Sequence, residues 1–145
     1  KNLIVTRTFS KAFGLASVRL GYCMGHPDTL SHLRKIRNGK AVNALAQLCG
    51  IAALDDLDYL DSRIDEMNDA KKFFVDNLPH QYYAVDSYTN FVLLKTPNAK
   101  EVLDKMKENK ILIRDRSSFT NLEDCVRITI GSKKQIIRVL NVINL

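Results

Sequence analysis

Apolar positions near the start of the chain follow two spacings. Residues 3–5 form a short apolar run, and residues 18–24 alternate large apolar side chains with polar or small ones. Both patterns are typical of strands, so we expect two strands joined by a tight turn. Apolar side chains then recur every three residues over residues 30–36, which predicts a short helix that ends near Gly39.

Two further helical patterns occupy the middle of the chain. An Ala-rich apolar stripe over residues 43–54 predicts a largely buried helix, and a second stripe runs from residue 57 to Pro79. Four aspartates lie between residues 55 and 61. A calcium loop would need a central Gly and a terminal Glu, which are absent here. We therefore interpret the aspartates as N-capping residues that complement the helix dipole.

From residue 81 the apolar period changes repeatedly. The pattern predicts strands at 82–85, 91–94, 111–114 and 126–130, and helices at 98–108 and 133–145. Side chains expected to face inward from the two helices are Val102, Leu103, Met106, Ile136, Ile137, Leu140 and Ile143. This order of elements predicts an α+β domain, a small and mostly antiparallel sheet covered by helices on one face.

The two halves of this pattern differ in kind. We expect residues 1–40 to be a piece of a different sheet and residues 41–145 to form the α+β domain. Because the chain begins with Lys1, almost directly before a strand, we interpret it as part of a longer protein.

Charge narrows the function only weakly. The chain has 22 basic and 16 acidic residues, a net charge of +6. Such an excess attracts nucleic acid, anionic membranes or phosphorylated small molecules, and it selects none of them. The basic residues are spread along the chain, which favours an ordinary solvated cationic surface.

Cysteine, histidine and hydropathy patterns exclude several classes. The three cysteines are odd in number, far apart and set in apolar surroundings, so we expect small core residues of a reducing compartment and not a disulfide set. The three histidines lack zinc-ligand spacing, and we assign no metal. No apolar run approaches the ~20 residues of a membrane span. We therefore expect a soluble cytoplasmic protein.

Candidate chemistry gathers in the turn between the first two strands. In an extended segment Thr8 and Ser10 point the same way and Lys11 the other, so two hydroxyls can hold one end of a ligand. Arg19 returns on the second arm and can add a charge-assisted contact to a phosphate. A phosphorylated aldehyde held this way would present its carbonyl to Lys11 for Schiff-base formation. On spacing alone, the alternative is a surface lysine in a polar turn.

A longer motif around Lys11 favours Schiff-base chemistry over an ordinary surface lysine. Residues 8–16, TFSKAFGLA, followed by RLGY at 19–22, resemble the pyridoxal-phosphate lysine signature of class II aminotransferases, most closely the histidinol-phosphate aminotransferases. Residues 111–115 and 126–131 agree with that family in order and position. The resemblance covers essentially the whole chain as the C-terminal part of such an enzyme. It implies an α/β parent fold, of which residues 1–40 are a remnant of the large cofactor-binding domain and residues 41–145 the small domain.

The resemblance also implies roles for matching residues. Lys11 would hold pyridoxal 5'-phosphate as a Schiff base and move a proton on the substrate, while Thr8, Ser10 and Arg19 would hold the cofactor phosphate. Two more arginines would bind substrate anions, namely Arg127 and Arg114. For Arg114 a surface salt bridge is the alternative. Arg127 also suits this role on its own terms, because the apolar residues of its strand fill the opposite face.

The implied reaction is amino transfer between an amino acid and a phosphorylated carbonyl compound such as imidazole acetol phosphate. Ser17 stands where the family more often has Gly, and residues 39–45 lack the usual Pro- and Tyr-containing segment. A related aminotransferase acting on a sugar or polyol phosphate therefore stays open, as do a decarboxylase or carbon–carbon lyase and a non-catalytic basic binding module. We expect a homodimeric parent enzyme of amino-acid biosynthesis with no nucleic acid or membrane partner. Because the cofactor-binding N-terminal half is missing, we expect the chain alone to be inactive and without cofactor.

Overall fold

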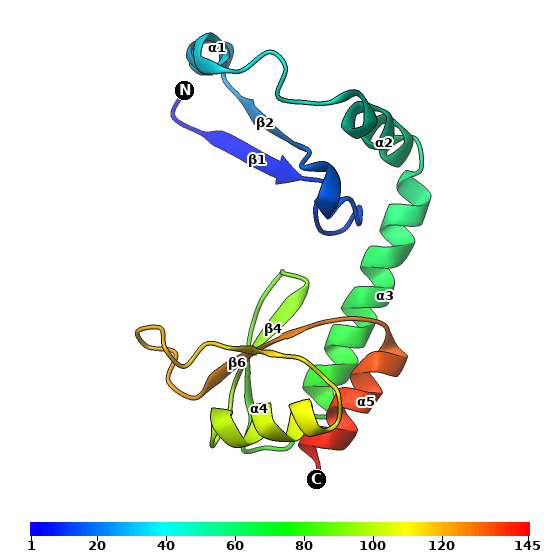
Figure 1. Ribbon diagram of the computed structural model, residues 1–145, viewed down its shortest axis with the longest axis vertical. Helices are drawn as coiled ribbons and strands as arrows, with labels where there is room; N and C mark the ends of the chain where they lie inside the picture. The colour runs from blue at the N-terminus through cyan, green and yellow to red at the C-terminus, as the bar shows by residue number, and fades with distance from the viewer. The chain divides into compact units, whose positions relative to one another are not determined.

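The computed structural model describes residues 1–145, and the chain divides into two compact units (Figure 1). We refer to residues 1–63 as the N-terminal unit and to residues 64–145 as the C-terminal unit. The division falls inside one continuous helix, α3. The predicted boundary at residues 40–41 concerns the parent domains to which the two parts belong, and it stays a prediction. No helix combines the length and the apolar content that crossing a bilayer requires.

The elements follow the predicted order along the chain. They are β1 (Ile4–Thr8), the 3₁₀ turn η1 (Ala16–Val18), β2 (Gly21–Gly25), α1 (Pro27–Ile36), α2 (Ala44–Leu54), α3 (Leu57–Asp76), β3 (Tyr83–Val85), β4 (Phe91–Lys95), α4 (Ala99–Glu108), β5 (Arg114–Asp115), β6 (Cys125–Thr129) and α5 (Lys133–Ile143).

In the N-terminal unit β1 and β2 form an antiparallel pair in which Thr8 lies opposite Gly21. The second strand begins three residues later than predicted. Residues 16–18 form a 3₁₀ turn, and Arg19 then adopts a left-handed backbone conformation that cannot continue a strand.

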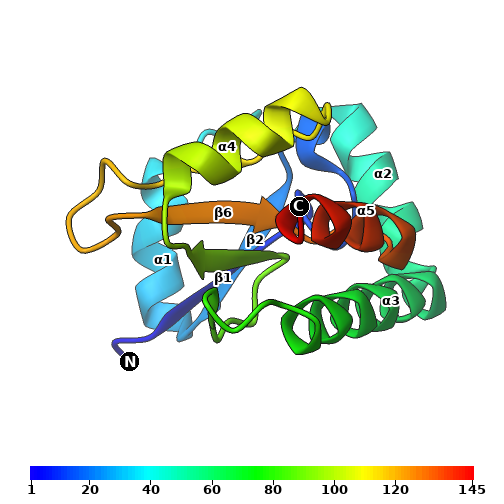
Figure 2. The same ribbon diagram turned by 90° about the horizontal axis from the view of Figure 1, so that it is seen from below.

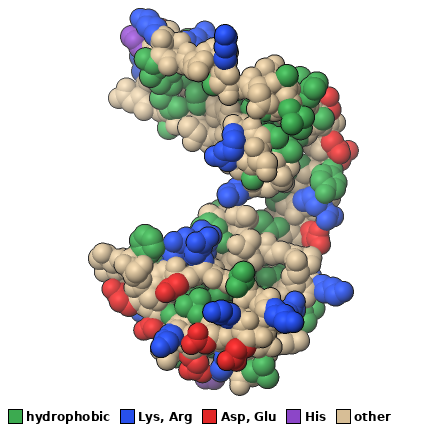
Figure 3. Space-filling model, viewed as in Figure 1, with side chains coloured by type: hydrophobic (Ala, Val, Ile, Leu, Met, Phe, Trp, Pro, Cys, Tyr) green, Lys and Arg blue, Asp and Glu red, His purple; other side chains and the backbone are tan.

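The predicted burial of α2 is wrong. The helix begins at its N-cap Asn43, whose side chain accepts a hydrogen bond from the Ala46 amide, but only Ala46 and Gly50 are buried. Its large side chains point to solvent, and Figure 3 shows apolar side chains on the surface of α2. The apolar pattern runs all round α2 and so does not show which side another part of the chain covers. Within the chain only the side with the small residues is covered. The small residues face the chain, and a Cβ on Gly50 would lie 2.5 Å from Leu20 Cδ2.

The aspartates before α3 act as predicted at one position. Asp56 Oδ1 accepts a hydrogen bond from the Tyr59 amide at 3.3 Å, which confirms an N-capping role. Farther along, α3 contributes Ala70 and Phe74 to the core of the C-terminal unit.

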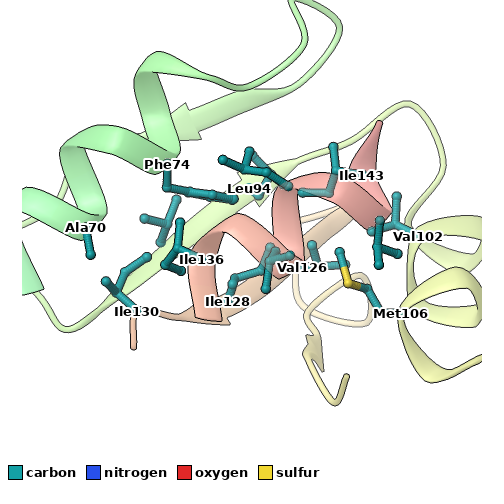
Figure 4. Packing of buried hydrophobic residues seen from close by; sticks show 14 of the residues in the cluster. Ala70, Phe74, Leu94, Val102, Met106, Val126, Ile128, Ile130, Ile136 and Ile143 are labelled. Carbon is teal, nitrogen blue, oxygen red and sulfur yellow. The ribbon is translucent and has the colours of Figure 1, made fainter. Parts of the chain in front are cut away.

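The C-terminal unit is the predicted α+β layer. Its sheet has the order β3-β4-β6-β5, and every neighbouring pair is antiparallel. Figures 1 and 2 show α4 and α5 side by side on one face of this sheet. The core lies between that face and the helices (Figure 4) and includes Ala70, Phe74, Val92, Leu94, Val102, Met106, Val126, Ile128, Ile136, Leu140 and Ile143.

One prediction for α5, that Ile137 faces inward, is wrong. Ile137 is 42% exposed, whereas Val139 and Val142 are buried. The buried stripe starts at Ile136 and continues at helical spacing, which turns Ile137 outward. A capping box formed by Ser132 and Gln135 begins the helix.

Candidate functional site

The first group of candidate residues lies in the loop that joins β1 to β2, residues 9–20, which we call the lysine loop, and at Thr8, the residue directly before it. Two hydrogen bonds extend the hairpin and close the loop: the Phe9 amide donates to Leu20 O at 3.1 Å, and the Leu15 amide donates to Phe9 O at 3.0 Å. The Gly14 amide donates to Lys11 O at 2.8 Å, which makes a tight turn after the lysine. Gly14 has φ +68°, a conformation that glycine adopts without steric cost.

An aromatic cluster holds this loop in place. Phe9 is 4% exposed, and its ring centroid lies 4.6 Å from that of Phe13 and 6.0 Å from that of Tyr22. Lys11 itself is exposed, and its amine makes no hydrogen bond or ion pair within the chain. The loop therefore presents a free primary amine on an anchored backbone.

The two hydroxyls do not lie in an extended segment, so the predicted reason for their common direction is wrong. β1 ends at Thr8 and the chain bends at Ser10. The bend occurs because Thr8 Oγ1 accepts a hydrogen bond from the Ser10 amide at 3.0 Å. The structure thus joins Thr8 and Ser10 through a local turn. The Ser10 hydroxyl makes no hydrogen bond within the chain.

Arg19 closes the other side of the loop. Its Nη1 donates to Ala16 O at 3.1 Å, and its backbone has φ 55°. A left-handed conformation costs a residue with a Cβ about 1–2 kcal/mol. A guanidinium has five N–H donors, so the bond to Ala16 leaves most of them available. Thr8, Ser10, Lys11 and Arg19 therefore occupy one loop and its end.

The second group lies on the sheet face opposite the core, which we call the open face. Arg127 of β6 pairs directly with Arg114 of β5 on one side and with Leu93 of β4 on the other. Directly opposed residues of an antiparallel pair project from the same face, and like charges placed so repel each other. Neither arginine has an acidic partner within the chain. This arrangement favours an added anion.

Arg127 also contacts Phe91, a residue that no sequence motif pointed to. Its Cζ lies 5.0 Å from the ring centroid of Phe91, and its Nε is buried without a hydrogen-bond partner. Alternation could have placed Phe91 on the open face, since the flanking position Val92 reads as core. Sequence spacing could not reveal the contact, because Phe91 and Arg127 lie on different strands, β4 and β6, that are far apart in the sequence.

The one carboxylate of β5, that of Asp115, makes no ion pair with either arginine. Asp115 lies opposite Val126, a core-face position, one step out of phase with Arg114. Its Oδ1 accepts a hydrogen bond from the Ser117 amide at 2.8 Å. That amide holds the pKa of the Asp115 carboxyl below its usual value, and the nearby Ser117 hydroxyl adds to the shift. The hydroxyl oxygen nevertheless lacks a hydrogen bond of good geometry.

Comparison with known proteins relates both groups to one family. Residues 1–143 match the family described as aminotransferase class I and II. The chain is 39% identical over 140 residues to the dihydroxyacetone phosphate transaminase of Campylobacter jejuni, covering 93% of this chain and 38% of the relative. It is 34% identical over 143 residues to the histidinol-phosphate aminotransferase of Haloarcula marismortui, covering 99% of this chain and 39% of that protein.

Solved structures with the same fold include members of this family. The histidinol-phosphate aminotransferase of Sinorhizobium meliloti, crystallised with pyridoxal 5'-phosphate, superposes with a TM-score of 0.84 at 29% identity, over 98% of this chain and 40% of that one. The L-threonine-O-3-phosphate decarboxylase of Porphyromonas gingivalis gives a TM-score of 0.85 at 29% identity, over 99% and 46%. The chain thus spans about two fifths of the length of the curated relatives it matches.

Proposed function

The chain belongs to the class I and II aminotransferases, and from that premise we propose that its parent protein transfers an amino group between an amino acid and a phosphorylated carbonyl compound, with pyridoxal 5'-phosphate as cofactor. The observation that carries this choice of substrate is the cross-strand pair of Arg114 and Arg127, which lacks an acidic partner. Two guanidinium groups match the charge and the fork geometry of a phosphate.

The donor set of the lysine loop fits the proposed cofactor. An exposed, unbonded amine at Lys11 suits an aldehyde, and the Ser10 hydroxyl and the remaining N–H groups of Arg19 suit a phosphate. Thr8 Oγ1 accepts the Ser10 amide, which leaves the hydroxyl hydrogen of Thr8 free to donate. When bound, pyridoxal phosphate supplies an electron sink for negative charge on the substrate α-carbon.

The chain's own residues would then divide the work. Lys11 Nζ holds the cofactor aldehyde before substrate arrives and afterwards accepts and returns the proton of the substrate α-carbon. Thr8, Ser10 and Arg19 orient the cofactor through its phosphate. In the second unit Arg127 binds the carboxylate of the donor or the phosphate of the acceptor, and the more exposed Arg114 gives a second contact to the anion.

The names of the relatives support a phosphorylated substrate. The relatives named above act on dihydroxyacetone phosphate, histidinol phosphate or a threonine phosphate. We take imidazole acetol phosphate as the first candidate acceptor. A sugar or polyol phosphate, or a three-carbon ketone phosphate, is the second, favoured by the unusual segment at 39–45 and by the Campylobacter relative.

One other reaction has a specific observation behind it. The similarity to the Porphyromonas decarboxylase at 29% identity makes decarboxylation of a phosphorylated amino acid the alternative to amino transfer. Carbon dioxide release without consumption of an amino acceptor would identify it.

The remaining parts of the proposal concern assembly. We propose a homodimeric parent in the cytoplasm, a reducing compartment that suits three free cysteines. The prediction that all three are core residues is wrong, since Cys125 is buried but Cys49 is half-buried and Cys23 lies exposed on β2. We further propose that the 145-residue chain alone does not transaminate. Its N-terminal unit leaves Leu45, Leu48 and Ile51 exposed, and its only sheet has two strands, an arrangement that is marginally stable by itself.

The proposal is tested on the parent protein and on the chain in parallel. The parent is given glutamate as donor and, separately, imidazole acetol phosphate and dihydroxyacetone phosphate as acceptors, and formation of the amine product is measured. Lys11→Ala should abolish turnover, whereas Lys40→Ala, a matched exposed lysine, should leave it unchanged. Turnover that survives Lys11→Ala, or that needs no phosphorylated acceptor, would contradict the proposal.

For the chain alone, pyridoxal phosphate is added and any adduct is fixed with borohydride and weighed by mass spectrometry. We expect no stoichiometric adduct at Lys11. A stoichiometric adduct that is absent from Lys11→Ala would show that the 145 residues form a cofactor site unaided, against this part of the proposal.

A further inference from the structure

We propose that Phe91 is a positioning residue for Arg127, and that its ring holds the guanidinium on the open face in the orientation that receives an anion. The inference deepens the proposed function and rests on it for the identity of the anion. Phe91 does not need to touch a substrate in order to act in this way.

The contact joins two neighbouring strands. Phe91 of β4 pairs with Thr129 of β6, so Arg127 is its diagonal neighbour on the same face. Diagonal neighbours are within reach of each other when one side chain is aromatic and the other long. The guanidinium carbon lies 5.0 Å from the ring centroid, inside the range of a cation–π contact.

The backbone around Phe91 is itself fixed. The Thr89 hydroxyl donates to Phe91 O at 3.0 Å, and the Ile130 amide donates to Asn90 O at 3.0 Å. These bonds fix the start of β4 against the end of β6. The backbone that carries the Phe91 ring is therefore fixed by hydrogen bonds.

The forces on Arg127 explain why it needs such support. Arg114 lies directly opposite and repels it, and no carboxylate of the chain attracts it. Its Nε is buried without an acceptor, which is costly for a charged donor. The Phe91 ring supplies the one attraction the structure shows for this guanidinium, and a cation–π contact uses none of its N–H groups as hydrogen-bond donors to the chain.

The experiment uses side-chain NMR of the 145-residue chain labelled at arginine Nε, with inorganic phosphate as the probe anion. In the unmodified chain we expect an Arg127 Nε–H order parameter of ~0.8, which should fall below ~0.6 in Phe91→Leu. Phe91→Tyr, which keeps the ring, should restore the order. Phosphate affinity should fall about three- to tenfold in Phe91→Leu and stay within about twofold in Phe91→Tyr.

A matched control comes from the same unit. Phe73 makes a cation–π contact of 4.8 Å with Lys133, so Phe73→Leu removes the same kind of interaction without involving Arg127. That variant should leave the Arg127 order and the phosphate affinity unchanged. If Phe91→Leu loses its folded amide spectrum, Phe91→Met takes its place.

The outcomes separate this inference from the proposed function. An Arg127 side chain that is disordered in the unmodified chain, or equally ordered without the ring, would overturn the positioning role. If phosphate leaves the Arg127 resonance unmoved while loss of the ring loosens the side chain, the positioning role stands and the anion site of the proposed function fails.

Discussion

Both units carry residues of the candidate site, but the two units have very different cores. The C-terminal unit buries a cluster of fifteen residues between its sheet and its helices. In the N-terminal unit the only buried apolar residues with a side chain are Phe9 and Ala46. The arginine pair therefore stands on a packed layer, whereas the lysine loop rests on a hairpin and a small aromatic cluster.

The comparison shows that apolar composition does not decide burial. α2 has the highest apolar content of any helix in the chain, yet Leu48 is 67% exposed. α5, with more polar residues, buries Ile136, Leu140 and Ile143 because its apolar positions share one face. We infer that stability resides mainly in the C-terminal unit.

The largest expected effect tests that difference in stability. Phe74 is fully buried in the C-terminal unit, so Phe74→Ala should lower the free energy of unfolding by about 3–5 kcal/mol. Urea unfolding followed by circular dichroism measures this. Leu48→Ala serves as the control and should change it by less than about 0.5 kcal/mol. Comparable losses from the two substitutions would refute the contrast between the units.

Next in size is the loss of anion binding on the open face. Arg127→Gln should weaken phosphate binding to the chain by about tenfold or more, since charge-assisted hydrogen bonds contribute about 1.5–3 kcal/mol. Arg114→Gln should have a smaller effect because Arg114 is more exposed. Calorimetric titration with phosphate provides the numbers. Arg138→Gln is the charge-matched control, since Arg138 donates to Asn109 O; an equal loss there would mean that only net charge matters.

A smaller effect is expected from the cap of α5. Ser132→Ala removes the acceptor for the Gln135 amide and should cost about 1 kcal/mol in the free energy of unfolding. Ser118→Ala, in an exposed loop, should cost nothing measurable. Urea midpoints of the two variants decide the point, and equal midpoints would argue against the capping box as a source of stability.

The smallest effect concerns pH. Because the folded pKa of Asp115 is lowered by the Ser117 amide, its contribution is present above the unfolded pKa and is lost as the pH falls through the lower folded value. Asp115→Asn should therefore flatten the acid side of the stability profile slightly, below about pH 4. Urea midpoints between pH 2 and 6 test this. Asp104→Asn is the control, and a flattening of the same size there would remove the explanation.

Much of the fold could be predicted because local signals agree with it. Three of the helices predicted from apolar spacing begin at a side chain that caps them, namely Asn43, Asn98 and Ser132. In β4 and β6 the alternation of apolar residues matches the face that is buried. The exposed face of α2 could not be predicted, because a helix that is apolar all round gives no direction.

In both units the sequence predicted which residues are candidates for the site, but it did not predict the local geometry that places them. The family resemblance named Thr8, Ser10, Lys11 and Arg19 as candidates, but it did not predict the bend at Ser10 or the left-handed backbone of Arg19, which belong to the local turn. Pairing of Arg114 with Arg127 follows from strand register, which the sequence does not specify. The contact of Arg127 with Phe91 depends on the same register.

Native-state hydrogen exchange of the 145-residue chain tests the central contrast most directly, because it reports the opening free energy of each strand separately. We predict that the amides of Val92 and Ile128 exchange only through global unfolding, whereas those of Arg7 and Phe9, which also lie at hydrogen-bonded positions of their strand pair, exchange at least about a hundredfold faster, a difference of about 3 kcal/mol in opening free energy. Equal protection of β1 and β6 would contradict the account.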